Sequence, residues 1–249
     1  MKIIIHGAAG RMGRMVEEKA RDFPGASIAA LVDPNVPAGG GEHCYAALTD
    51  YTGPADVAVD FSHHSAVGTL LDYCVARALP VVVGTTGHTA EEKEKIAAAA
   101  ERVPVFCSGN MSMGVAVLAD LARRAAAAFP EADIEIIETH HNQKLDVPSG
   151  TALLLADAVR EAREDAVLLV GRHENGRRTA REIGIHSIRL GGEVGTHEIL
   201  ISTGSETITL KHQAHSRALF AEGALRAAAF LIGKPAGLYS MKDMIEGEL

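Results

Sequence analysis

Short apolar runs rich in β-branched residues alternate with alanine-rich amphipathic segments along the first part of the chain. The apolar runs predict strands at residues 2–6, 28–33, 57–61, 81–85 and 103–107. The segments between them have apolar positions at helical spacing and predict helices at residues 12–23, 65–78 and 89–102. Parallel strands joined by crossover helices give this alternation, so we predict an α/β fold that begins with a doubly wound, Rossmann-like parallel sheet over residues 1–110.

The pattern changes after residue 110. Helices are expected at residues 113–129 and 151–163, and β-rich stretches at residues 133–140, 167–170, 185–190 and 198–211. The last two stretches have no helix between them, which predicts a second, α+β domain with a mixed sheet over residues 111–215. A helix from about residue 216 to 232 has an alanine-rich face, so we expect residues 216–249 to return to the first domain.

Composition and charge narrow the class of protein. The three cysteines, Cys44, Cys74 and Cys107, are odd in number and widely spaced, which indicates reduced thiols and a cytoplasmic location. The opening apolar run is too short for a signal peptide, and no window approaches the length of a membrane span. A net charge of −8 disfavours nucleic acid or an anionic membrane as the main partner.

A glycine-rich loop, GAAGRMG at residues 7–13, joins the first expected strand to the first expected helix. In this position glycines allow a tight turn and close approach of a pyrophosphate to the helix N-terminus. The spacing is GxxGxxG, a variant of the more familiar GxGxxG, so a plain glycine turn is the alternative interpretation.

Asp33 supports dinucleotide binding, because it ends the second strand where a carboxylate would accept hydrogen bonds from the adenosine ribose. This favours NADH. Arg11 and Arg14 could instead pair with the 2′-phosphate of NADPH or be solvated residues of the first helical turn, so use of both cofactors is expected. The run Gly84-Thr85-Thr86-Gly87 follows the fourth strand, where it would border the nicotinamide or only cap a helix.

The segment at residues 134–152, IEIIETHHNQKLDVPSGTA, holds the densest set of reactive side chains in the chain. Lys144 and neighbouring histidines suit an anionic substrate, and Lys144 could donate the proton that follows hydride addition. Ser149 is expected to cap a helix whose first N–H groups, at Gly150 and Thr151, would bind a carboxylate. Each of these residues could also be an ordinary loop or cap residue. A metal site is not expected, because the zinc-binding HExxH pattern is absent.

Several motifs together resemble the dihydrodipicolinate reductase family. They are GAAGRMG at 7–13, GTTG at 84–87, GNMSMGV at 109–115, HHNQKLDVPSGTA at 140–152, HQAHSRALFAEGALRAAAFL at 212–231 and GLYSMKDM at 237–244. The motifs span nearly the whole chain in the family's order. The resemblance implies NADH- or NADPH-dependent reduction of a cyclic dicarboxylate, made from pyruvate and aspartate semialdehyde, to tetrahydrodipicolinate on the lysine and diaminopimelate pathway. It also implies a homotetramer formed through the sheet of the second domain.

The resemblance also implies roles for individual residues. His140 and Lys144 would be the proton-transfer residues. His141, Gly150 and Thr151 would bind the substrate. The cofactor would contact Gly7, Ala8, Ala9, Gly10, Arg11, Met12, Asp33, Gly84, Thr85, Thr86, Ser108, Gly109, Asn110 and Met111.

Three positions depart from the family's pattern. Pro34 follows Asp33 where many members have an arginine, SHHSAV at 62–67 replaces a threonine-x-proline pattern, and Met111 stands where some members have an aromatic residue. Two other classes of protein are alternatives. Another amino-dicarboxylate dehydrogenase would not require the His-His-x-x-Lys loop, and a non-catalytic NAD(H) sensor would leave His140 and Lys144 without a role.

Overall fold

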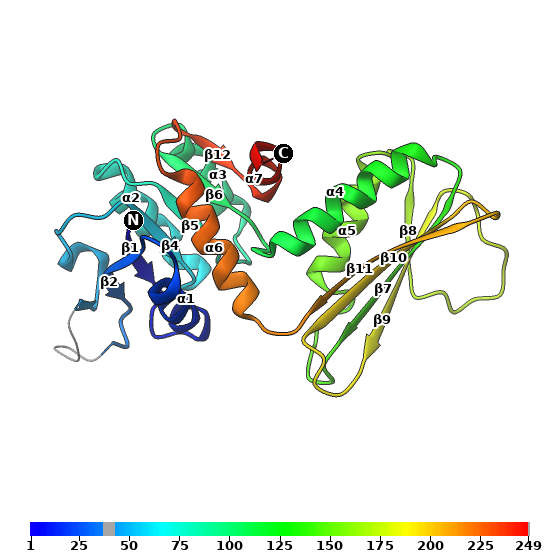
Figure 1. Ribbon diagram of the computed structural model, residues 1–249, viewed down its shortest axis with the longest axis horizontal. Helices are drawn as coiled ribbons and strands as arrows, with labels where there is room; N and C mark the ends of the chain where they lie inside the picture. The colour runs from blue at the N-terminus through cyan, green and yellow to red at the C-terminus, as the bar shows by residue number, and fades with distance from the viewer. Residues whose placement is uncertain (37–42, 249) are drawn as a thin grey trace. The chain divides into compact units, whose positions relative to one another are not determined.

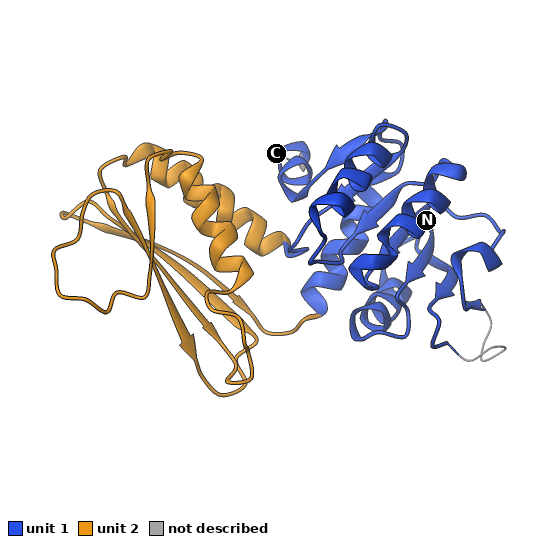
Figure 2. Ribbon diagram, turned by 180° about the vertical axis from the view of Figure 1, so that it is seen from behind, with its two compact units in different colours: residues 1–112, 218–249 blue, residues 113–217 orange. Residues whose placement is uncertain are grey.

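The computed structural model of the chain describes residues 1–36 and 43–248, which form two compact units (Figure 2). Unit 1 consists of Met1–Ser112 together with Ala218–Leu249, and unit 2 is the intervening Met113–Arg217. Unit 1 is therefore built from two separate stretches of sequence, and unit 2 is inserted between them.

Unit 1 is built on a parallel sheet (Figure 1). Within the described residues its strand order is β12-β6-β5-β4-β1-β2-β3, and every neighbouring pair is parallel. The strands are β1 (Lys2–His6), β2 (Ser27–Val32), β3 (Cys44–Tyr45), β4 (Val57–Asp60), β5 (Val81–Val83), β6 (Pro104–Cys107) and β12 (Gly237–Tyr239). This confirms the predicted doubly wound, α/β class.

Helices cover the unit 1 sheet. They are α1 (Arg11–Asp22), α2 (Val67–Ala76), α3 (Ala90–Ala100), α6 (Ala218–Leu231) and α7 (Met241–Glu248). Two of them, α2 and α3, pack on each other and on fully buried Ile4 and Val81, while α6 packs beside α1. The alanine-rich face predicted for the last long helix is buried in α6. Small alanine side chains let α6 lie close to its neighbours.

Unit 2 contains a mixed sheet with helices on one face (Figure 1). Its strands are β7 (Asp133–His140), β8 (Val167–Val170), β9 (Glu182–Arg189), β10 (Gly195–Ser202) and β11 (Thr207–Ala214). In the order β11-β10-β7-β9-β8, strands β10 and β11 are antiparallel to their neighbours, whereas β7, β9 and β8 run parallel. The prediction of a mixed sheet is confirmed.

Two helices, α4 (Met113–Ala128) and α5 (Gly150–Arg160), pack against one face of this sheet. Strand residues of one parity, such as Ile134, Ile185 and Ile199, form a core with Leu118 and Leu155 of the helices. Residues of the other parity face away from α4 and α5. This alternation is the period-2 pattern of a half-covered sheet.

One expected β-rich stretch is divided in two, and among the described residues several short elements were not predicted. The β-rich stretch at 198–211 is two antiparallel strands, β10 and β11, because the chain reverses at Gly204, whose φ of +87° suits glycine. The short strands β3 and β12 and the terminal helix α7 were missed. Strands of two or three residues carry little periodicity of their own and are fixed by pairing with a longer neighbour.

Candidate active site

The glycine loop of unit 1 connects β1 to α1. Gly7 has a φ of +81°, and a Cβ added there would lie 2.6 Å from the backbone oxygen of Phe61. A Cβ on Gly13 would lie 2.1 Å from the carbonyl oxygen of Gly7. These glycines therefore let α1 begin directly against the end of β1. The N-cap residue, Gly10, makes no side-chain hydrogen bond to the backbone N–H groups at the start of α1. No cap side chain therefore separates these groups from a bound pyrophosphate.

Asp33 follows β2 beside this loop. Its carboxylate is mostly buried and accepts hydrogen bonds from the backbone N–H of Ala9 at 3.2 Å and of Asn35 at 2.9 Å. Arg11 and Arg14 lie exposed on the first turn of α1. The sequence-predicted acidic residue is thus held against the glycine loop, where a carboxylate would meet a ribose.

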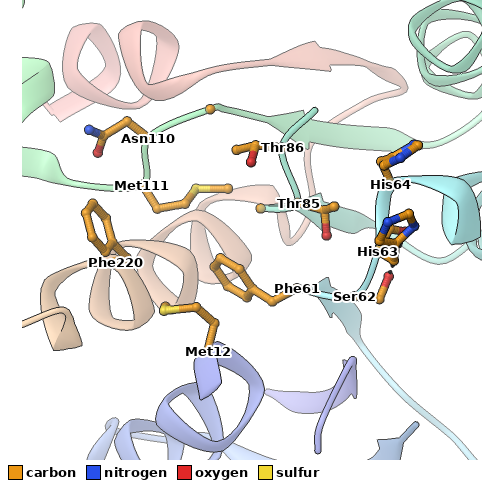
Figure 3. Close-up of a pocket in the computed structure, with 12 residues that line it drawn as sticks. Met12, Phe61, Ser62, His63, His64, Thr85, Thr86, Asn110, Met111 and Phe220 are labelled. Carbon is orange, nitrogen blue, oxygen red and sulfur yellow. Dashed lines mark hydrogen bonds between the residues drawn. The ribbon is translucent and has the colours of Figure 1, made fainter. Parts of the chain in front are cut away.

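A pocket of about 430 Å³ lies at the carboxyl ends of β4, β5 and β6 within unit 1 (Figure 3). Seven of the predicted cofactor-binding residues line it: Met12, Gly84, Thr85, Thr86, Gly109, Asn110 and Met111. Open parallel sheets bind ligands at this end of their strands. Gly7, Ala8, Ala9, Gly10, Arg11, Asp33 and Ser108 are not part of the lining. Ser108 instead fixes the backbone of Asn110 through its hydroxyl, at 2.7 Å from the carbonyl oxygen.

Five residues that line the pocket were not predicted from the sequence: Phe61, Ser62, His63, His64 and Phe220. The first four follow β4 directly, so their position after the apolar run at 57–60 was the signal that could have identified them. The two histidine rings lie 4.2 Å apart. His64 also pairs with Glu92, at 2.9 Å from Nδ1 to Oε2, which links the pocket to α3.

A buried carboxylate, Asp60, connects two segments that line the pocket with the end of β1. Asp60, at the end of β4, is fully buried, and one of its oxygens lies 2.7 Å from His6 Nδ1 and 2.6 Å from the Ser62 hydroxyl. Its other oxygen accepts from the Thr85 hydroxyl at 2.6 Å. Asp60 therefore connects the residue before the glycine loop to two segments that line the pocket.

In unit 2, the end of β7 places His140 beside a buried carboxylate. Glu138 is fully buried, and its Oε2 lies 2.5 Å from His140 Nδ1. Arg189 of β9 reaches the same carboxylate with both terminal nitrogens, at 2.9 Å and 3.0 Å. Two-fold hydrogen bonding of this kind is the strongest geometry for an arginine and a carboxylate.

The protonation of these groups follows from their surroundings. Burial tends to raise the pKa of Glu138, but the hydrogen bonds from Arg189 and His140 outweigh it and hold that pKa at about 2. Burial lowers the pKa of His140, and Glu138 only partly opposes this effect. The positive charges of Lys144 and Arg189 also lower the pKa of His140. Glu138 is thus a carboxylate at neutral pH, and the His140 ring is driven toward its neutral form.

The loop after β7 carries the remaining predicted residues. The Lys144 ammonium lies 2.7 Å from an Asp146 oxygen, and the backbone N–H of Lys144 donates to the carbonyl of His141. Lys144 is one of the charged residues that lower the pKa of His140. His141 is partly exposed on the same turn.

The start of α5 lies next to His140 and a second histidine. Ser149 caps the helix by accepting from the N–H of Ala152 at 3.2 Å, and its hydroxyl also lies 3.1 Å from His197 Nε2. The rings of His140 and His197 meet edge to face at 5.2 Å. Gly150 and Thr151 form the first turn of α5, as predicted, so their backbone N–H groups belong to a helix N-terminus. Burial, with His140 nearby, lowers the pKa of His197 to about 4.

Sequence reasoning missed Glu138, Arg189 and His197. Glu138 had a signal, because a glutamate two residues before His140 on the same strand points to the same side. Arg189 and His197 come from strands β9 and β10, and only the pairing of those strands with β7 brings them near His140. Within the described part of the chain, no group of three or more histidine, cysteine or acidic side chains could hold a metal ion. No helix among the described residues is long and apolar enough to cross a membrane.

A glycine loop on a doubly wound sheet, with a separate unit that carries histidine and lysine beside a capped helix, defines a two-domain, nicotinamide-dependent oxidoreductase. Models of the dihydrodipicolinate reductase N-terminus and C-terminus match residues 1–111 and 114–245. The chain belongs to the dihydrodipicolinate reductase family.

Individual relatives agree with this membership. A 4-hydroxy-tetrahydrodipicolinate reductase from Caldanaerobacter subterraneus subsp. tengcongensis is 41% identical over 253 residues, covering 99% of this chain and 98% of that protein. The Clostridium novyi enzyme of the same name is 42% identical over 249 residues, covering 99% of each chain. A solved structure of dipicolinate-bound dihydrodipicolinate reductase from Paenisporosarcina sp. TG-14 has a TM-score of 0.82 at 27% identity, covering 96% of this chain and 97% of that one.

Proposed function

We propose that this protein reduces 4-hydroxy-tetrahydrodipicolinate, the cyclic product of pyruvate and aspartate semialdehyde, to tetrahydrodipicolinate with NADH or NADPH, in lysine and diaminopimelate biosynthesis. The observation that carries the proposal is the unit 2 cluster of His140, Lys144 and the Ser149-capped helix, in a chain that matches the family in both its parts. The net reaction adds one hydride and one proton and releases one water.

The substrate's carboxylate is bound at the start of α5. The N–H groups of Gly150 and Thr151 lie at the positive end of the helix dipole, which favours an anion. Neighbouring His141 and Lys144 add donors. The Lys144 ammonium delivers the proton that the ring takes up after hydride addition, because it is the only cationic donor among the residues predicted for this site. His140 contacts the reacting ring.

The residues of unit 1 fit a dinucleotide, which would supply the hydride when bound. The glycine loop offers the start of α1 to the pyrophosphate, and Asp33 is held where it accepts from the ribose hydroxyls. Arg11 and Arg14 are exposed and able to approach a 2′-phosphate, which supports use of both cofactors.

A coupled assay tests the function. A synthase generates the unstable substrate from pyruvate and aspartate semialdehyde, this protein is added, and the loss of reduced-nicotinamide absorbance is followed. We expect oxidation that depends on both proteins and both starting compounds. Absence of that oxidation, combined with NAD⁺-dependent oxidation of an amino dicarboxylate, would reassign the chain to the other dehydrogenase class.

We further propose a cytoplasmic homotetramer. The face of the unit 2 sheet opposite α4 and α5 carries apolar side chains, among them Ile137, Ile188 and Leu200, and Ile188 is 45% exposed. Pairing two such faces would bury these side chains, and a second pairing would complete four subunits. The cysteines Cys44, Cys74 and Cys107 are all free, which is typical of a reducing compartment.

A further inference from the structure

We propose that Glu138 and Arg189 are positioning residues that hold His140 as the neutral ring protonated on Nδ1, with Nε2 as its hydrogen-bond acceptor toward the substrate. This inference rests on the proposed function, because it specifies how His140 takes part. It concerns side chains of unit 2 alone.

The hydrogen bonds of Glu138 determine its charge state. Both of its oxygens accept from the Arg189 guanidinium, and Oε1 also accepts from the backbone N–H of Ser149 at 3.2 Å. A protonated carboxyl would have to lose at least one of these donors. Full burial makes such a loss costly, so Glu138 remains a carboxylate.

The charge of Glu138 in turn fixes the tautomer of His140. An ionised carboxylate can only accept hydrogen bonds, and its Oε2 lies 2.5 Å from His140 Nδ1. Nδ1 must therefore carry the proton. In the neutral ring the second nitrogen, Nε2, then has a lone pair. Among the described residues, Nδ1 is the ring nitrogen that makes a hydrogen bond, which leaves Nε2 available to a ligand.

The neutral state of His140 follows first from the burial of the ring and then from the charged groups around it. Glu138 of β7 favours the charged ring, but Arg189 of β9 neutralises that carboxylate and Lys144 of the following loop adds a second positive charge. His197 of β10 lies edge-on to the ring and is itself kept neutral by burial. The Asp146 carboxylate offsets part of the charge of Lys144, but burial together with the two cations still disfavours a positive charge on His140.

Arg189 also positions the lysine. Its second terminal nitrogen, besides binding Glu138, donates to the backbone carbonyl of Asp146 at 2.7 Å. The Asp146 carboxylate is the partner of Lys144. The Arg189 guanidinium therefore connects Glu138, which orients His140, with the loop that carries Lys144.

Gly195 of β10 leaves space at Nε2. A Cβ added to Gly195 would lie 3.0 Å from His140 Nε2, closer than an ordinary van der Waals contact. A side chain at this position would crowd the nitrogen that we assign to the substrate. Glu138 thus binds one ring nitrogen, Nδ1, and Gly195 leaves room beside the other, Nε2.

The tautomer can be read directly by nitrogen-15 NMR of the whole protein labelled at histidine, with His140 assigned by comparison with His140→Gln. We expect a neutral His140 at pH 7 with a protonated Nδ1 and an unprotonated Nε2. A proton on Nε2 of the neutral ring, or a doubly protonated ring at pH 7, would overturn the proposal. This measurement requires neither substrate nor activity.

A substitution at Glu138 tests the consequence for the reaction. Glu138→Gln can present its amide N–H to Nδ1, so we expect the Nε2-protonated tautomer to appear and kcat to fall on the order of 100-fold. We expect NADH affinity to be unchanged. We also expect the pH profile of kcat to shift together with the pKa of the His140 ring. Unchanged tautomer and kcat in a folded variant would refute the positioning role. If the variant does not fold, the NMR result on the unaltered protein still decides.

Glu135→Gln is the matched control. Glu135 is on the same strand, three residues earlier, and also pairs with a histidine, His186, at 2.8 Å and with Arg178 at 3.0 Å, but it lies outside the site. We expect it to leave the His140 tautomer and kcat within about two-fold of the unaltered protein. Failure of the unaltered protein in the coupled assay would contradict the proposed function, whereas a wrong tautomer in an active enzyme would contradict only this inference.

Discussion

The histidines of unit 2 show how the surroundings of one side chain determine its chemistry. His197 is 3% exposed, and its pKa is lowered to about 4. His186 instead lies at the partly exposed face of the sheet beside Glu135. Burial costs a charged ring more than a neutral one, so the buried histidine releases its proton while the surface ring keeps a carboxylate partner.

The lowered pKa of His197 predicts a loss of stability in mild acid. In the folded protein the pKa of His197 is about 4, below the ordinary value of 6.5. Between pH 6.5 and pH 4, His197 is therefore protonated in the unfolded chain but remains neutral in the folded protein. This proton uptake lowers the free energy of unfolding by about 2 kcal/mol at pH 5. Urea unfolding at pH 7 and pH 5 should show that His197→Gln loses less stability than the unaltered protein. Equal losses would mean that His197 is not the group responsible.

Replacement of Lys144 tests the proton donor. We predict that Lys144→Ala lowers kcat by roughly 10²-fold or more, because the ring would lose its proton source, while NADH affinity stays nearly the same. Turnover in the coupled assay and cofactor titration measure the two effects separately. Lys211→Ala, which removes an exposed lysine paired with Glu198, is the control and should keep full turnover. Unchanged turnover in Lys144→Ala would remove Lys144 from the mechanism.

Asp33 is the residue at which cofactor preference is expected to change. Asp33→Ala removes the carboxylate that would repel a 2′-phosphate and accept from ribose hydroxyls, so the ratio of kcat/KM for NADPH over NADH should rise roughly ten-fold. Steady-state kinetics with each cofactor give the ratio. Asp22→Ala, at the exposed end of α1, should not alter it. A constant ratio in Asp33→Ala would show that the ribose lies elsewhere.

At the scale of helices and strands, the sequence predicted elements that carry their own periodicity. The helical stripe through Met12, Val16 and Ala20 and the alternation of the strand at 133–140 gave α1 and β7 within a residue. Ser149 was expected as an N-cap and accepts the backbone hydrogen bond of a cap, whereas the cap of α3 was left open between Thr86 and Thr89 and is Thr89. Local sequence patterns are enough to predict a helix or strand when buried and exposed positions alternate regularly along it.

What the sequence did not predict depends on contacts between distant segments. Strand β12 has three residues and exists through its pairing with β6, while the Asp60 network needs His6, Ser62 and Thr85 from three separate strand ends. The loop after β7 was identified because its reactive residues are adjacent in sequence. The residues that hold them, such as Arg189, are not adjacent, and no spacing rule connects them.

The cap of α5 provides a prediction at this scale. Ser149→Ala removes the hydroxyl that binds the Ala152 N–H and contacts His197, so stability should fall by about 1 kcal/mol. We also expect a higher KM for the dicarboxylate, because the first turn of α5 would be less well ordered. Thr89→Ala removes the equivalent cap of α3 and should lower stability similarly without changing that KM. Equal KM values in the two variants would show that the first turn of α5 does not bind the substrate.

At the scale of the whole molecule, the two units present different kinds of surface. Unit 1 has helices on its sheet, with α2 and α3 packed on Ile4 and α6 beside α1. Unit 2 covers one face of its sheet with α4 and α5, and the other face retains Ile188 and Leu200 among polar neighbours. Antiparallel and mixed sheets tolerate one open face, but an exposed isoleucine beside a partly buried leucine on such a face favours association.

This open face predicts where the assembly can be broken. Ile188→Glu places a charge in the proposed contact, and we expect sedimentation to change from a tetramer toward single chains of 26.2 kDa. Leu238→Glu, at a comparably exposed leucine of β12 in unit 1, should leave the assembly intact. A tetramer that persists in Ile188→Glu would place the interface on another surface.

The split of unit 1 into two stretches of sequence has a consequence for synthesis on the ribosome. When residues 113–217 have emerged, the sheet formed by the earlier residues still lacks its edge strand β12 and the helix α6 that packs on it. Until residue 218 and those after it appear, the apolar surface that buried Ala224 and Leu225 later cover remains bare. A nascent chain at that stage contains all of unit 2 but only part of unit 1, and its exposed apolar surface makes it prone to aggregation and to chaperone binding.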